Sequence, residues 1–137
     1  MKCFTPFVVL GLVALAGCAT GSGNYLYFPA LAQRVLAGDE QAYGELLSTA
    51  DRTPPGEQLE ELAELSSRFV RVAPVAFLQK QRGTSTCFGV SFMGPDYTDN
   101  PVAVAKEIGL RRKALESVSD PALISTQQRC LAELAGS

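Results

Sequence analysis

The chain has 137 residues, with 12 Lys and Arg against 14 Asp and Glu, four Cys, and neither His nor Trp. This length suits one domain, and a hydrophobic fraction of 47% is too high for a disordered chain. The absence of His removes the commonest general base and the Ser-His and Cys-His nucleophile pairs, and the absence of a basic excess removes the main source of affinity for nucleic acid. We therefore expect a folded protein that is neither an enzyme nor a nucleic-acid binder.

The first 17 residues have the pattern of a targeting segment. A charged start at Lys2 precedes an apolar run over residues 4–16, and small residues follow it. Pro6 interrupts the run, which falls short of the ~20 apolar residues that a membrane-spanning helix needs. Residues 1–17 are therefore predicted to be a cleaved signal peptide.

The end of this segment, Leu15-Ala16-Gly17-Cys18, resembles the lipobox of bacterial lipoproteins. The resemblance covers residues 1 to about 20, and it implies cleavage before Cys18 and acylation of its sulfur and new amino terminus. Several acyl chains together anchor a protein stably. The residue after the cysteine, Ala19, is not the Asp that favours retention at the inner membrane. The implied location is the periplasmic face of the outer membrane, or the cell surface; an ordinary secretory peptide is the alternative.

With lipid on Cys18 and Cys3 removed with the signal, two cysteines remain. Cys87 and Cys130 would lie in an oxidising compartment, so they are predicted to form a disulfide. The long loop it closes makes it worth roughly 4 kcal/mol by the chain-entropy argument. Two buried thiols, or a redox or metal role, are the alternatives. Without His or a CxxC spacing, we expect no metal and no cofactor.

Residues 18–28 are predicted to be the lipidated cysteine and a flexible tether, rich in Gly and Ser, before a single helical domain at 29–137. Four apolar and aromatic residues end the tether: Tyr25, Leu26, Tyr27 and Phe28. Either they dock on the core of the domain or they rest at the membrane surface. We favour docking.

From Pro29 onward the pattern is helical. A capping residue followed by proline occurs three times, at Thr53-Pro54, Asn100-Pro101 and Asp120-Pro121, and predicts three helix starts. Asp39, after a break at Gly38, predicts a fourth start.

Apolar residues at helical spacing predict about six short helices in antiparallel pairs. They fall at about 31–36, 39–50, 55–72, 74–78, 104–118 and 123–134. The expected fold is all-α, either a helical bundle or a repeat-like stack, with a loose resemblance to α-helical hairpin and repeat scaffolds.

Residues 83–99 do not fit the helical pattern. Phe88, Val90 and Phe92 alternate as in a strand, but one strand has no partner in a helical chain, so a long ordered loop pinned at Cys87 is predicted. Long ordered loops are often functional, and aromatic and Met side chains offer large contact areas. The predicted binding residues are Phe88, Phe92, Met93 and Tyr97, unless they pack back onto the helices.

Three groups of charged residues carry weaker predictions. A row of acids on one helix, Glu57, Glu60, Glu61 and Glu64, is predicted to be a solvated face, with an acidic recognition face as the alternative. Three basic residues on different sides of another helix, Arg111, Arg112 and Lys113, are predicted to be solvated. Asp96, Asp99 and Asn100 lack the spacing of a calcium loop, so calcium is not expected.

The function predicted from these features is that of a lipid-anchored, non-catalytic protein-interaction module. It would be an accessory subunit of an envelope or secretion assembly, or an inhibitor of the immunity-protein type. A lipid or small-molecule carrier, with an apolar cavity between helices, is the first alternative. A glycan hydrolase with two carboxylates across a cleft is the second.

Overall fold

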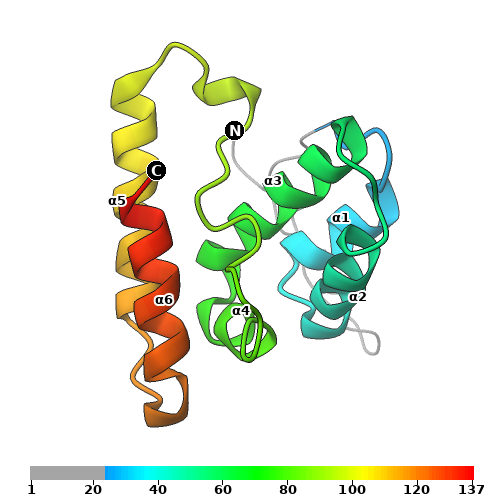
Figure 1. Ribbon diagram of the computed structural model, residues 1–137. Helices are drawn as coiled ribbons and strands as arrows, with labels where there is room; N and C mark the ends of the chain where they lie inside the picture. The colour runs from blue at the N-terminus through cyan, green and yellow to red at the C-terminus, as the bar shows by residue number, and fades with distance from the viewer. Residues whose placement is uncertain (1–23) are drawn as a thin grey trace, which may run out of the picture.

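Six α-helices and two short 3₁₀ helices make up most of residues 24–137, the part of the chain that the computed structural model describes (Figure 1). The α-helices are α1 (Pro29–Leu36), α2 (Glu40–Ala50), α3 (Glu57–Val72), α4 (Pro74–Lys80), α5 (Pro101–Glu116) and α6 (Ile124–Ala135). The 3₁₀ helices are η1 (Pro95–Tyr97) and η2 (Pro121–Leu123). The described residues contain no strand, and the all-α prediction is confirmed. The predicted signal peptide and Cys18 lie outside this range.

Capping side chains set three of the helix starts as predicted. Asp39 and Asn100 each accept the backbone N–H of the residue three positions on, at 3.0 and 3.1 Å. Asp120 accepts the N–H two positions on, at 2.9 Å, and begins η2, which leads directly into α6. These bonds satisfy N–H groups that have no partner within the first turn.

The start predicted at Thr53-Pro54 is wrong. The next helix, α3, begins only at Glu57, after a glycine whose φ is 144°. The Thr53 hydroxyl donates to the Thr49 carbonyl oxygen at 2.7 Å, so it closes the end of α2 instead. A second proline explains the difference, because Pro55 disfavours the helical conformation of the residue before it.

Helix α3 lies at the centre of the molecule and contacts α1, α2, α4 and α5, while α5 and α6 run antiparallel at one side (Figure 1). Tyr43 stacks on Phe69 with ring centroids 4.1 Å apart, and the Phe77 ring lies 5.8 Å from Tyr43. Leu and Val side chains from all six α-helices complete this core: Leu31, Val35, Leu46, Leu62, Leu65, Val70, Leu78, Leu115 and Leu134. None of these helices is long and apolar enough to cross a membrane.

Helix α5 differs from its predicted apolar stripe. Leu115 is fully buried as expected, but the other two buried residues of the helix, Glu107 and Arg111, are charged. The apolar Val104 and Ile108 are only half-buried. The side of α5 that faces the rest of the molecule is therefore partly charged, and it contributes to the candidate site.

Candidate functional site

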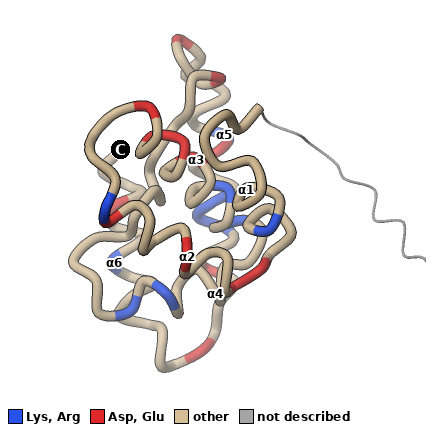
Figure 2. Tube along the Cα trace, turned by 90° about the vertical axis from the view of Figure 1, so that its right-hand side faces the viewer, with Lys and Arg blue, Asp and Glu red and all other residues tan. Residues whose placement is uncertain are grey.

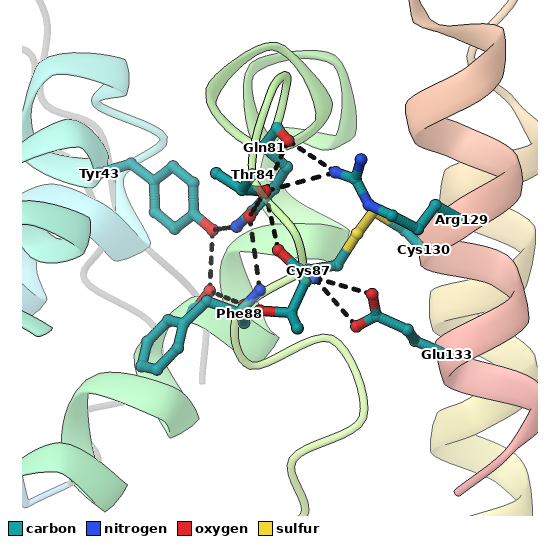
Figure 3. Close-up of a disulfide and its surroundings, with 10 residues drawn as sticks. Tyr43, Gln81, Thr84, Cys87, Phe88, Arg129, Cys130 and Glu133 are labelled. Carbon is teal, nitrogen blue, oxygen red and sulfur yellow. Dashed lines mark hydrogen bonds between the residues drawn. A yellow bond between two sulfur atoms is a disulfide. The ribbon is translucent and has the colours of Figure 1, made fainter. Parts of the chain in front are cut away.

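Residues 83–99 form the predicted ordered loop, and a disulfide pins the loop to α6 (Figure 3). The predicted pair, Cys87 and Cys130, is bonded, with Cα atoms 5.4 Å apart. The Cys87 N–H also donates to both carboxylate oxygens of Glu133 on α6, at 2.9 and 3.0 Å. One covalent bond and one charge-assisted contact thus attach the same point of the loop to α6.

A polar network beside the disulfide fixes the start of the loop (Figure 3). The Gln81 side-chain amide donates to the buried Tyr43 hydroxyl at 2.8 Å. Arg129 donates to the Gln81 carbonyl oxygen at 2.7 Å, and Thr84 bonds the same carbonyl at 2.7 Å. Burial raises the pKa of Tyr43, so this hydroxyl stays neutral and can take part in hydrogen bonds in both directions.

The middle of the loop lies directly on α3. The Ser66 hydroxyl donates to the Phe88 carbonyl oxygen at 2.6 Å. The next residue, Gly89, has φ of 76°, and a Cβ atom there would lie only 2.7 Å from the Ala63 carbonyl oxygen. Only glycine allows this approach, and the buried Val90 follows it.

A buried arginine on α5 holds the rest of the loop. Arg111 is 2% exposed, and its Nη1 donates to the carbonyl oxygens of Val90 and Phe92 at 3.0 and 2.7 Å. Its Nε donates to Glu107 Oε1 at 3.0 Å, and Arg71 Nη1 on α3 donates to Glu107 Oε2 at 3.0 Å. One buried carboxylate therefore joins α3, α5 and, through Arg111, the loop.

The prediction that Arg111 is solvated is wrong, whereas its neighbours Arg112 and Lys113 are exposed as predicted. The physical reason lies in the loop. A buried segment without strand partners leaves carbonyl oxygens that need donors, and the guanidinium group supplies them. Glu107, one helical turn before Arg111, compensates the buried charge.

An open hollow of about 470 Å³ lies where α3, α5 and the loop meet. We call it the arginine hollow. Its charged and polar wall includes Glu64, Arg68, Arg71, Tyr97, Glu107 and Arg111, and its apolar edge is formed by Leu36 and Val72. Arg68 Nη2 bonds Glu64 Oε1 at 2.9 Å. Figure 2 shows that basic and acidic positions are distributed along the whole trace, and the hollow brings three arginines together.

The four predicted binding residues do not gather in one exposed patch. All are half-buried, and Phe88 packs against the core. Tyr97 lines the arginine hollow, where burial, and then the nearby Glu107 carboxylate, raise the pKa of its hydroxyl. Phe92 lines a second hollow of about 170 Å³ beside the acid row of α3. Met93 lines neither hollow.

The acid row of α3 binds the segment that precedes α1. The Glu61 carboxylate accepts the backbone N–H groups of Leu26, Tyr27 and Phe28, at 2.8 to 3.2 Å, and Glu57 accepts the Tyr27 hydroxyl. The row is therefore more than a solvated face. The segment docks as predicted through Tyr25 and Phe28, which pack against the core, while Leu26 is 78% exposed.

Sequence reasoning missed Arg68, Arg71 and Glu107. One signal was present, because Glu64 and Arg68, like Glu107 and Arg111, stand four residues apart, the spacing of an ion pair on a helix. This spacing predicts each pair. It does not predict that the two pairs face one another across α3 and α5.

Comparisons of this chain with family models, with curated proteins and with solved structures found no match. Among residues 24–137, no three His, Cys, Asp or Glu side chains are grouped so that they could hold a metal ion.

Proposed function

We propose that this protein is a membrane-anchored, non-catalytic protein-interaction module. The anchor is the lipid on Cys18 implied by the lipobox resemblance, and the location is the periplasmic face of the bacterial outer membrane. The partner is an envelope protein, and the surface that contacts it is the arginine hollow with the adjoining 83–99 loop.

The observation that carries the proposal is the way in which this loop is held. A simple connection between two helices does not require such contacts. This loop is held by a disulfide at Cys87, by the close approach of Gly89 to α3 and by hydrogen bonds from the buried Arg111. A surface whose shape is fixed before binding loses little conformational entropy when a partner docks. The loop and the hollow beside it are thus preorganised for contact.

Two versions of this function use the same surface. An accessory subunit would remain with a large envelope assembly in stable proportion. An inhibitor of the immunity-protein type would protect the cell from one lytic enzyme. Copurification and protection assays separate the two versions.

The alternatives fit the hollow less well. A lipid carrier needs an apolar cavity, whereas three arginines line this one. A glycan hydrolase needs a protonated acid in apolar surroundings, whereas Glu64 and Glu107, the two carboxylates of the hollow, are each bonded to arginine. Binding of a partner is the function that these contacts support best.

Site-specific photo-crosslinking in intact cells tests the proposal. A photoreactive amino acid replaces Thr98, which is exposed beside Tyr97, or Gln128, which is exposed on α6. We expect one specific adduct from position 98 and none from the matched control at position 128. The adduct should weaken strongly in a Cys18→Ser background, because the unlipidated protein is no longer concentrated at the membrane. Identical adducts from both positions, or none from position 98, would contradict the proposal.

A further inference from the structure

The arginine hollow carries a local surplus of positive charge. Its wall contains three guanidinium groups and two carboxylates. Glu107 uses one oxygen on Arg111 and the other on Arg71, and Glu64 is bonded to Arg68. Two arginines share the single charge of Glu107, and one of them is 2% exposed. A charge surplus at a poorly hydrated site favours binding of an anion.

Two of the arginines still have donors to offer. Arg71 Nη1 donates to Glu107, and Arg68 Nη2 donates to Glu64. Neither guanidinium donates another hydrogen bond within residues 24–137. Their side chains are 45% and 39% exposed. The two residues lie three positions apart on α3, so they share one face of the helix. Each guanidinium is held by one carboxylate, and that of Arg68 also lies 5.9 Å from the Tyr25 ring centroid. The unused N–H groups of the two arginines are available to a planar anion.

The remaining wall indicates which anion fits. The surplus is one charge, which a carboxylate balances and a dianionic phosphate exceeds. Leu36 and Val72 border the hollow next to Arg71 and Arg68, and Val72 is 46% exposed, so an apolar group attached to the anion has a surface to cover. A volume of about 470 Å³ lies in the range of pockets that hold drug-sized ligands, which leaves room for the end of a peptide.

We propose that the arginine hollow binds the free C-terminal carboxylate of a peptide segment whose last side chain is apolar. The unused N–H groups of Arg68 and Arg71 hold the carboxylate, and Leu36 and Val72 contact the side chain. This inference rests on the proposed function and specifies the partner's chemistry: the partner presents a chain end, not a folded acidic surface.

Fluorescence polarisation on the full chain in detergent tests the assignment. The probes are labelled hexapeptides of mixed sequence that end in Leu or Val, with a free carboxylate or, as the control, with an amide. We expect the carboxylate peptides to bind at least tenfold more tightly than the amides. Arg71→Gln should weaken binding at least tenfold, whereas Arg112→Gln, on the exposed side of α5, should leave it unchanged. Should Arg71→Gln fail to fold, Arg68→Gln, whose partner Glu64 is more exposed than Glu107, replaces it.

Three outcomes would overturn the assignment. They are equal binding of acid and amide peptides, equal binding by Arg71→Gln and Arg112→Gln, and no binding of either peptide. Displacement of the peptide by inorganic phosphate at equal concentration would also overturn it, in favour of a phosphate site. A specific adduct from position 98 alongside any of these results would leave the interaction function standing, so the two proposals fail separately.

Discussion

At the scale of single residues, the two loop glycines with positive φ show two different roles of glycine. Gly83 and Gly89 have nearly the same backbone conformation, with φ of 75° and 76°. A Cβ atom at Gly83 would meet nothing within 4 Å, whereas at Gly89 it would lie 2.7 Å from both Ala63 O and Ser66 Cβ. The left-handed conformation is common to both positions, and the close approach to α3 is confined to Gly89.

We therefore expect Gly89→Ala to destabilise the protein more than Gly83→Ala does. The substitution at position 83 should lower the free energy of unfolding by about 1 kcal/mol, the cost of a left-handed alanine. The one at position 89 should cost roughly 1–3 kcal/mol more, because the loop must move away from α3. Urea unfolding of both variants measures the difference, and equal losses would show that the loop does not rest on α3 as described.

The helix caps that sequence reasoning placed correctly make local contacts. Asp39 and Asn100 cap the chain three residues ahead, so the pattern that predicts them lies within one helical turn. Arg111 instead bonds carbonyl oxygens about twenty residues away, on a loop that has no periodic pattern. Its spacing from Glu107 indicates the ion pair, but nothing near it in the chain indicates the carbonyl oxygens that it bonds.

At the scale of elements, the loop contacts α3 on one side and the α5–α6 pair on the other, and so connects them. Apolar spacing predicted the helices, and the cysteine count predicted the bond that holds the loop. The arginine hollow could not be predicted in this way, because its walls come from α3 and α5, and no local pattern reveals which helix faces which. The aromatic composition of the loop predicted a binding site on the loop itself. Much of the polar surface of the hollow belongs instead to the helices beside the loop.

Replacing both Cys87 and Cys130 with Ala should lower the free energy of unfolding by about 4 kcal/mol, since an open loop gives the unfolded chain more conformations. We also expect the double variant to exchange its amide hydrogens faster than the wild type around Phe88 and Val90, because the loop loses its attachment to α6. The change in α2 should be smaller. Urea unfolding and exchange mass spectrometry measure the two effects. Wild-type protein in excess reductant should match the double variant, and a loss below 1 kcal/mol would mean that noncovalent contacts alone hold the loop.

At the scale of the whole molecule, the four tyrosines link stability to alkaline pH. Burial raises the pKa of Tyr25 to about 12 and also raises those of Tyr43 and Tyr97, and a hydrogen bond to Glu57 raises that of Tyr27. Each group therefore favours the folded state while it is neutral. Its contribution is complete below the unfolded pKa near 10 and declines as the pH rises through the folded value.

Titration of the folded protein should accordingly show the tyrosinate absorbance at 295 nm rising at a higher pH than it does for the unfolded chain. Alkaline unfolding, followed by circular dichroism, should make the remaining tyrosines ionise together. The same titration in concentrated urea gives the control, with all four groups ionising near 10. A tyrosine that ionises at or below pH 10 in the folded protein would contradict the burial and hydrogen bonding described above.

The disulfide also determines how the molecule transmits mechanical load. Cys87 and Cys130 stand 43 positions apart, so their bond closes the second part of the loop, α5, η2 and half of α6 into a covalent ring. Tension along the chain crosses from residue 87 to residue 130 through sulfur and bypasses everything between. At roughly 3.5 Å per residue, the closed segment has an extended length of ~150 Å, and this length cannot be pulled out while the disulfide is intact. A pull on the two ends of the chain can therefore extend the backbone of α1 to α4, whereas the backbone of α5 stays inside the closed ring.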